Sequence, residues 1–228
     1  MPPDKLPSMC EVDLFAALSH EELGELERRV PDVFIECGRI FYTPWYRGEN
    51  FFLLLEGGVR IYRCLGSREQ TVSIVRPGTF FGEAALAALE QGAFAQALED
   101  SRVAIMHRGT LRRLVADSPE VGMMMIEILS ERLNVYESRL EEMALREVPA
   151  RLACLILRMA EDEGVRDDEG YKVPTHYTHE LLGTMVGCGR PATTRALHYL
   201  RDAGAVRLQG RRIRVVDSRV LEHIAGSG

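Results

Sequence analysis

Runs of hydrophobic and polar positions divide the chain into a helical start, a strand-rich middle and a helical end. From residue 33 to residue 107, short apolar or alternating runs are separated by glycines, which is the pattern of strands joined by tight turns. Strands this short and this regularly spaced predict a small antiparallel barrel or roll. Before them, residues 13–30 place apolar side chains at helical spacing, and Ser19 with Glu22 forms a capping-box pattern that predicts short helical pieces.

The longest helical pattern begins at Pro119 and reaches about Arg146. Its apolar residues recur at alternating spacings of three and four, which is the heptad seam of a two-stranded coiled coil. The seam comprises Ile126, Leu129, Leu133, Tyr136, Leu140 and Met143. A second apolar stripe beside it is expected to pack on the roll, and it comprises Val121, Met125, Ile128 and Val135.

One apolar face of this helix is used by the roll and the seam is left for a second neighbour. This arrangement predicts a homodimer joined through the helix. Arg132 and Glu137 fall at a g position and the following e′ position, where a parallel partner helix would pair them. A single buried helix inside a monomer is the alternative interpretation.

The stretch from residue 178 to residue 204 predicts two short helices joined by a tight turn. Gly187 is expected to end the first helix, because glycine adopts the left-handed conformation there without a steric penalty. The second helix turns apolar residues inward, and four polar residues near its start are expected to face outward: Arg190, Thr193, Thr194 and Arg195. A helix exposed at its N-terminal end in this way can enter the major groove of DNA, which predicts a helix-turn-helix.

Further elements surround this motif. Val148-Pro149 is expected to be a hinge, followed by a helix over residues 149–164 with proline in its first turn. A polar stretch at 165–174 predicts a short hairpin arm. Two strand-like pieces across Gln209-Gly210 predict a wing beside the second helix of the motif, and a short helix ends the chain.

Length and composition narrow the class of protein. The chain has 228 residues, enough for two modest domains with their own cores. No apolar run approaches the roughly 18 residues of a membrane span, and the N-terminus lacks the apolar core of a signal peptide. A cytoplasmic protein with no membrane partner is therefore expected.

Cysteine usage adds a second restriction. The five cysteines are scattered and contain no CxxC pair, which argues against a disulfide framework, a structural zinc site and an iron–sulfur cluster. Reduced and mostly buried cysteines are expected, with redox sensing by Cys10 or Cys64 as the alternative.

Charge is distributed unevenly along the chain. From His176 to the end, eight arginines face four acidic residues, a balance of +4; because the whole chain carries −6, the rest carries −10. A basic end on an acidic body indicates a module that contacts nucleic acid.

Three stretches together resemble the cyclic-AMP receptor protein and fumarate–nitrate regulator (CRP/FNR) family: RPGTFFGEAAL at 76–86, the long helix from Pro119, and LLGTMVGCGRPATTRAL at 181–197. The resemblance implies an α+β fold: an N-terminal antiparallel β-roll of the cyclic-nucleotide-binding, jelly-roll type over 1–118, a dimerisation helix and hinge over 119–147, and a winged helix-turn-helix over 148–228. It also implies a homodimeric transcription regulator that binds pseudo-palindromic double-stranded DNA and contacts RNA polymerase.

The resemblance assigns DNA-binding roles to ten residues. Arg190 and Arg195 match positions that read bases, where arginine can contact guanine O6 and N7. Thr178, His179 and Thr193 match phosphate-contacting positions, and Arg211 and Arg212 of the wing are expected to act similarly. Gly189, Pro191 and Thr194 complete the set. Family members usually carry glutamate where this chain has Pro191, so its half-site is predicted to differ from the usual one at that base pair.

The effector pocket departs further from the family. Gly82 and Glu83 match residues that hold a ribose and a phosphate-facing amide, but Gln91-Gly92 stands where cyclic-nucleotide-binding members have arginine followed by serine or threonine. From Ala84 to Ser101 the chain contains no Arg or Lys, so a buried phosphate would lack its charged partner. No cyclic AMP and no cofactor are expected; haem is disfavoured because GEAAL has no Cys or His. A regulator without an effector is favoured over one switched by an unidentified small ligand or a redox signal.

Two other classes of function compete with a DNA-binding regulator. An enzyme built on a cupin-like barrel would need several metal-binding histidines, and only His107 lies near the roll. His176 and His179 could be metal ligands, but without an obvious third ligand phosphate contact or surface exposure is favoured. A cyclic-nucleotide-binding module that regulates a partner protein is disfavoured by the basic helix-turn-helix.

Overall fold

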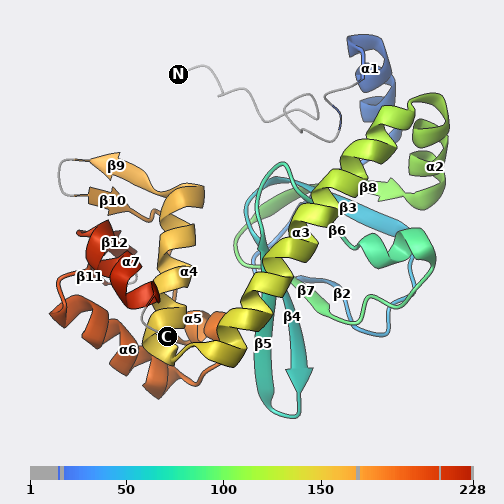
Figure 1. The fold of residues 1–228 in the computed structure, drawn as a ribbon. Coiled ribbons are helices and arrows are strands. Elements are labelled where there is room, and N and C mark those ends of the chain that lie inside the picture. The colour runs from blue at the N-terminus through green and yellow to red at the C-terminus, as the bar shows by residue number, and fades with distance from the viewer. Residues whose placement is uncertain (1–14, 16–17, 168–169, 211, 227–228) are drawn as a thin grey trace. The chain divides into compact units, whose positions relative to one another are not determined.

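The computed structural model describes residues 15, 18–167, 170–210 and 212–226. They form two compact units, Met1–Leu133 and Asn134–Gly228 (Figure 1). The boundary lies inside the long helix α3 (Pro119–Leu145), so this helix contributes to both units.

The first unit contains two four-stranded antiparallel sheets with strand orders β1-β8-β3-β6 and β2-β7-β4-β5. This architecture confirms the predicted roll. Its elements are α1 (His20–Arg29), β1 (Asp32–Ile35), β2 (Ile40–Tyr42), β3 (Asn50–Glu56), β4 (Val59–Leu65), β5 (Arg68–Val75), β6 (Phe80–Phe81), the 3₁₀ helix η3 (Glu83–Ala87), β7 (Phe94–Ala97), β8 (Ser101–His107) and α2 (Arg108–Asp117).

Strand β3 lies at the centre of the first unit. Five consecutive residues, Phe51–Leu55, are buried, because the strand pairs with β8 and β6 and contributes side chains to both apolar clusters of the unit. The rings of Phe52 and Phe81 stack with centroids 5.1 Å apart. Offset aromatic contacts of this kind add to the free energy of simple burial.

Helix α1 begins where the capping box predicted. The Ser19 amide donates to Glu22 Oε2 at 2.8 Å, and the Glu22 amide donates to Ser19 Oγ at 3.3 Å. The hydrogen bonds from Ser19 keep the pKa of the Glu22 carboxyl below its usual value. The helical piece expected before Ser19 falls largely outside the described residues.

The two apolar stripes of α3 differ in burial. Val121 and Met125 are buried in the core of the first unit and Ile128 packs against it, as predicted. Val135 is 45% exposed and belongs to the second unit, so its packing on the roll stays a prediction. Residues of the seam are exposed: Ile126 57%, Leu129 36%, Leu133 57%, Leu140 68% and Met143 43%, while Tyr136 is half-buried.

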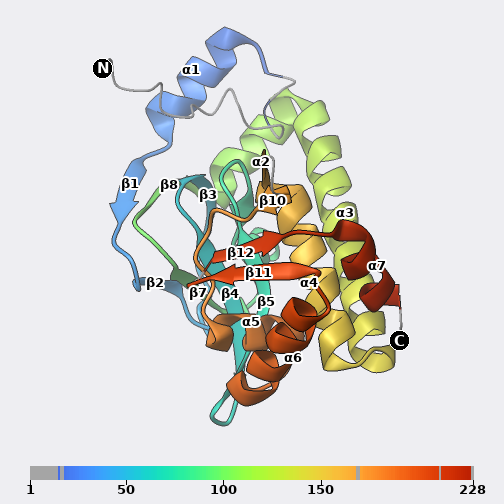
Figure 2. The ribbon, with the colours of Figure 1, turned by 90° about the vertical axis from the view of Figure 1, so that its left-hand side faces the viewer.

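The second unit is organised around α4 (Val148–Glu163), which contacts α5, α6, α7 and β12. The predicted arm and wing join in one antiparallel sheet of order β11-β12-β10-β9, and β11 and β12 are visible beside α6 and α7 in Figure 2. The elements are β9 (Val165–Asp167), β10 (Gly170–Lys172), α5 (His179–Val186), α6 (Arg190–Asp202), β11 (Val206–Gln209), β12 (Arg212–Val215) and α7 (Ser218–Gly226).

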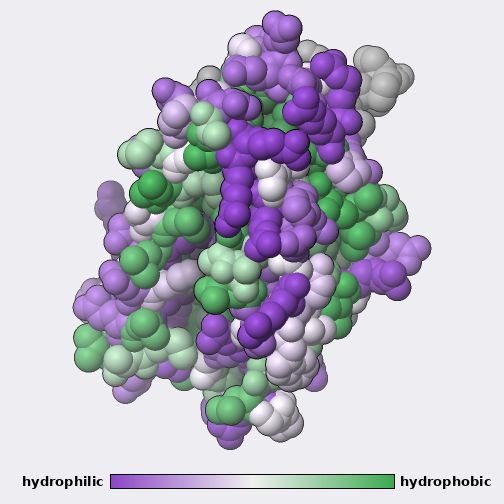
Figure 3. Space-filling model, turned by 90° about the vertical axis from the view of Figure 1, so that its right-hand side faces the viewer, coloured by the Kyte–Doolittle hydropathy of each residue, from purple (hydrophilic) through white to green (hydrophobic). Residues whose placement is uncertain are grey.

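The molecular surface mixes polar and apolar residues. On the face drawn in Figure 3, hydrophilic residues gather near the top and hydrophobic residues form separate patches among them. Within the described ranges, no helix has both the length and the apolar character needed to cross a bilayer.

Candidate nucleic-acid interface

Helices α5 and α6 form the predicted helix-turn-helix. Thr178 caps α5, with its Oγ1 accepting from the Leu181 amide at 3.0 Å. Gly187 ends the helix with φ of 70°, the left-handed conformation expected of it. Leu182 and Val186 are buried at 1% and 4% exposure and hold α5 on the core of the second unit.

The turn between the helices is packed very closely. The Cys188 amide donates to the Gly183 carbonyl at 2.9 Å, and Thr193 Oγ1 lies 3.2 Å from the Gly189 carbonyl and 3.3 Å from Cys188 Sγ. The Thr193 side chain is 0% exposed. The prediction that Thr193 faces outward to contact a phosphate is therefore wrong: its hydroxyl is turned into the corner, where it satisfies the Gly189 carbonyl.

Replacement of Gly183 by alanine tests this packing. An added Cβ would lie 2.7 Å from both the Cys188 carbonyl oxygen and Thr193 Oγ1, closer than real Cβ contacts come. We expect the free energy of unfolding to fall by about 1–3 kcal/mol, as for other overpacked sites. Gly189→Ala is the matched control, because its Cβ would meet only Pro191 Cδ at 3.8 Å. Thermal denaturation in which both variants unfold together would contradict the account of the turn.

The start of α6 presents charged and polar groups to solvent. Arg190, Pro191 and Arg195 are exposed. Thr194 is half-buried and its hydroxyl is engaged: Oγ1 donates to the Arg190 carbonyl at 3.0 Å and lies 2.9 Å from Nδ1 of His179. Since that hydroxyl has one proton, it accepts from His179, and this bond ties α5 to α6. Outward exposure is thus seen for the two arginines and only in part for Thr194.

A second histidine connects the wing to the motif. Arg212 Nε of β12 donates to Nε2 of His176 at 2.7 Å. His176 and Arg212 are both exposed, so a cation and an imidazole stand together on the surface of the second unit. Arg211 lies outside the described residues. Among the residues that are described, no three His, Cys, Asp or Glu side chains come together as metal ligands.

The effector-pocket residues are held by the chain's own side chains. Gly82 has φ of 82° at the start of η3, and its carbonyl accepts from Gln91 Nε2 at 3.1 Å. The Glu83 carboxylate pairs with Arg132 of α3 at 3.3 Å, and the Arg132 guanidinium lies 4.4 Å from the centroid of the Phe80 ring. The predicted pairing of Arg132 with Glu137 of a partner helix stays a prediction, and within the chain the Arg132 guanidinium engages Glu83.

Gln91 and Arg132 thus contact Gly82 and Glu83, the two residues that the resemblance assigns to a ribose and a phosphate-facing amide. One cation that sequence reasoning missed does approach: a Cβ on Gly92 would lie 3.4 Å from Nη2 of Arg63 in β4. Arg63 is brought there by the pairing of β4 with Phe94–Ala97, just after Gly92, a long-range register that no local sequence pattern reveals.

The described cysteines are free thiols, with Cys37 and Cys64 exposed, Cys188 half-buried and Cys154 buried. Burial raises the pKa of the Cys154 thiol, which keeps it protonated. Cys37 Sγ donates to the Leu98 carbonyl at 3.1 Å. Cys10 lies outside the described residues.

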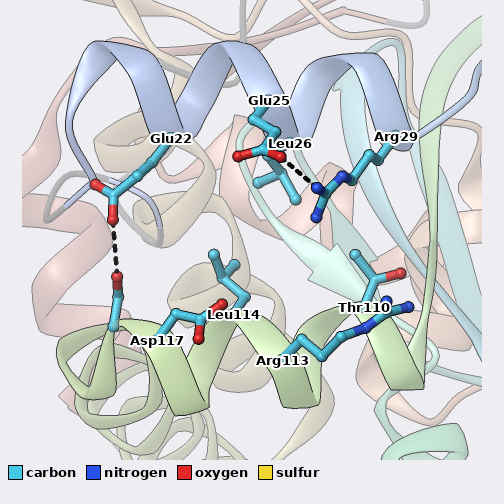
Figure 4. Close-up of a pocket in the computed structure, with 9 residues that line it drawn as sticks. Glu22, Glu25, Leu26, Arg29, Thr110, Arg113, Leu114 and Asp117 are labelled. Carbon is cyan, nitrogen blue, oxygen red and sulfur yellow. Dashed lines mark hydrogen bonds and ion pairs between the residues drawn. The ribbon is translucent and has the colours of Figure 1, made fainter.

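A further cavity lies between α1 and α2 (Figure 4). Two contacts join residues that line it: Arg29 pairs with Glu25 within α1, and Ser118 Oγ donates to Glu22 Oε1 at 3.3 Å. None of its lining residues belongs to the effector set predicted from the sequence.

Comparison with known proteins connects both halves of the chain to described families. The model of the cyclic nucleotide-binding domain matches residues 33–118, and that of the Crp-like helix-turn-helix domain matches residues 150–224. The chain is 25% identical over 217 residues to a CRP-like cAMP-activated global transcriptional regulator of Mycobacterium tuberculosis, covering 93% of this chain and 96% of that protein. It is 29% identical over 220 residues to the cyclic AMP receptor protein of Thermus thermophilus, with the same coverage.

The fold is also similar to that of solved regulators. A CRP/FNR family transcriptional regulator from Thermus thermophilus superposes with a TM-score of 0.71 at 26% identity, over 86% of this chain and 99% of that one. The roll, the long helix and the helix-turn-helix therefore occur together in relatives as they do here.

Proposed function

Because the chain belongs to the CRP/FNR family of transcription regulators, we propose that it is a homodimer that binds a pseudo-palindromic promoter site without cyclic AMP and without another effector. Regulators of this family bind DNA through their helix-turn-helix. The observation that carries effector independence is that Arg132 and Gln91 engage Glu83 and Gly82 from within the chain.

The proposed DNA contacts are divided by chemistry. Arg190 and Arg195, exposed on the first turns of α6, read base edges in the major groove. Thr178, His179 and Arg212 contact phosphates and set the register of the protein on the duplex. Pro191 provides no side-chain donor or acceptor, so the half-site differs from the usual family site at its base pair.

The proposed dimer uses the exposed seam of α3. A helix that leaves Ile126, Leu133 and Leu140 more than half exposed gains free energy by burying them against a second copy. Two reading helices held in this way would enter the major groove about 34 Å apart, one turn of DNA. In this scheme residues 1–118 form the effector-type domain, 119–147 the dimerisation helix and hinge, and 148–228 the DNA-binding domain, which brings the protein to RNA polymerase at a promoter.

Binding-site selection followed by fluorescence anisotropy tests effector independence. The purified protein without additions is expected to bind its selected site with a Kd of about 10⁻⁸ M at physiological salt, and the Kd should change less than twofold with cyclic AMP. Affinity should weaken steeply with salt through counterion release. Calorimetry that gives micromolar affinity for cyclic AMP, or DNA binding that appears only with it, would contradict the proposal.

A regulator switched by a small anion is the second candidate, favoured by the approach of Arg63 to Gly92. Arg63→Gln distinguishes the two candidates, because an effector-free regulator keeps its DNA affinity in this variant. A regulator activated by a cellular anion would lose activation in a promoter–reporter strain while retaining its basal affinity in vitro.

A further inference from the structure

The segment between β10 and α5 alternates between the core and the surface. Val173 and Tyr177 are buried at 0% and 2% exposure, and Thr175 between them is half-buried. Pro174, His176 and Thr178 are exposed. Alternation with a period of two is that of an extended strand, so one side of the segment faces the core and the other faces solvent.

On the inward side, one carboxylate binds two side chains of the segment. Glu163, the last residue of α4, accepts from the Tyr177 hydroxyl through Oε1 at 2.6 Å and from the Thr175 hydroxyl through Oε2. Hydrogen bonds from hydroxyls to an ionised carboxylate are short and about twice as strong as neutral ones. Glu163, Thr175 and Tyr177 thus form one unit, which we call the clasp.

Stability of α4 does not explain a glutamate at this position. A negative charge at the C-terminal end of a helix opposes the helix dipole. The Tyr177 ring is buried among the core residues of the second unit, and an apolar residue there would need no partner, whereas a buried phenolic hydroxyl does. The role of the Glu163 carboxylate is instead to bind the segment that leads into the helix-turn-helix.

The outward side of the same segment carries His176 and Thr178, and it leads directly to His179; Thr178 and His179 are two of the proposed phosphate contacts. His176 accepts from Arg212 of the wing at 2.7 Å, and Thr178 caps α5. His179 follows at once and lies 2.9 Å from Thr194 of the reading helix. The segment therefore joins the wing, α5 and α6.

We propose that Glu163 is a positioning residue for DNA binding, acting through Thr175 and Tyr177 to hold His176, Thr178 and His179 at the distance from α6 that the phosphates of one duplex require. This inference rests on the proposed DNA-binding function. Glu163 itself does not touch DNA.

Electrostatics and positioning predict opposite changes in DNA affinity for Glu163→Gln. Removing a negative charge from a DNA-binding domain strengthens binding, because the phosphate backbone attracts net positive charge. Loss of the clasp weakens binding, because the phosphate-contacting side chains lose their fixed placement. Glu161 lies two residues earlier on α4 and is exposed, so Glu161→Gln removes the same charge and leaves the clasp intact.

The experiment compares full-length wild type, Glu163→Gln, Tyr177→Phe and Glu161→Gln by anisotropy on the selected site and on a random duplex across a salt series. For Glu163→Gln and Tyr177→Phe we expect an affinity loss of about 3- to 10-fold on both duplexes and a salt slope shallower by about 1, the signature of a lost phosphate contact. Glu161→Gln should bind as tightly as wild type or slightly more tightly.

The outcomes distinguish failure of the positioning role from failure of the proposed DNA-binding function. If wild type prefers its site while Glu163→Gln and Tyr177→Phe bind like Glu161→Gln with an unchanged slope, the clasp has no positioning role. If wild type shows no preference for any duplex, the proposed function itself fails. Circular dichroism checks that each variant folds. If Glu163→Gln does not fold, the affinity and salt slope of Tyr177→Phe, which removes only a hydroxyl, test the positioning role.

Discussion

Replacing Leu133 with aspartate is expected to give a folded monomer whose affinity for the selected DNA site is about 100-fold lower or worse. Leu133 is 57% exposed at the middle of the α3 seam, so the charge is tolerated in the isolated chain. In a dimer the same carboxylate would be buried opposite its own copy, and an unpaired buried charge costs several kcal/mol. Two linked half-sites bind far more tightly than one, so loss of the dimer removes that advantage.

Asn134→Asp is the matched control for this change. Asn134 is the next residue of α3 and is exposed, and it lies off the seam, so the same charge should leave the dimer intact. Sedimentation velocity measures the oligomeric state and anisotropy measures DNA affinity. A dimeric Leu133→Asp variant, or a monomeric wild type that binds its site tightly, would show that α3 does not join the two copies.

Replacing Arg195 with alanine is the second change with a large expected effect. A bidentate contact to guanine discriminates by about 1–3 kcal/mol, and a symmetric dimer loses it twice, so affinity for the selected site should fall about 30-fold or more. Affinity for a random duplex should fall only a few-fold, because one charge is lost. Arg195→Lys should behave nearly like alanine on the selected site, since lysine cannot make the planar paired contact.

Arg201→Ala controls for the loss of positive charge. Arg201 lies in the last turn of the same helix and pairs with Asp202 at 2.8 Å, away from the end that enters the groove. It should leave both affinities close to those of wild type. Equal losses on selected and random DNA for Arg195→Ala would mean that Arg195 contacts a phosphate. Repeating site selection with Arg190→Ala then identifies the base that each arginine reads.

Elements with strong local periodicity were predictable from the sequence. The seam of α3, the capping box at Ser19 and the left-handed Gly187 depend on neighbours within a few residues, and local spacing is sufficient to infer them. Strand β6 is not predictable in this way, because Phe80–Phe81 is too short to show any alternation.

Side-chain direction was less predictable where it depends on distant partners. Thr193 is polar and lies between two exposed arginines, Arg190 and Arg195, yet its hydroxyl is turned into the corner beside Gly183. Arg132 fits a heptad g position, but Glu83 of the same chain lies within ion-pair distance. Glu163 and Tyr177 are 14 positions apart, and no sequence period relates them.

The ion pair between Arg132 and Glu83 has a consequence for how cells would use such a regulator. If the regulator needs no effector, as proposed from this ion pair, it has no metabolite to report on, so its copy number becomes the input. Well below the dimerisation constant, the active species rises with the square of the amount synthesised. The output of its target promoters would then rise more than proportionally with the amount of regulator, which is set by its transcription and turnover.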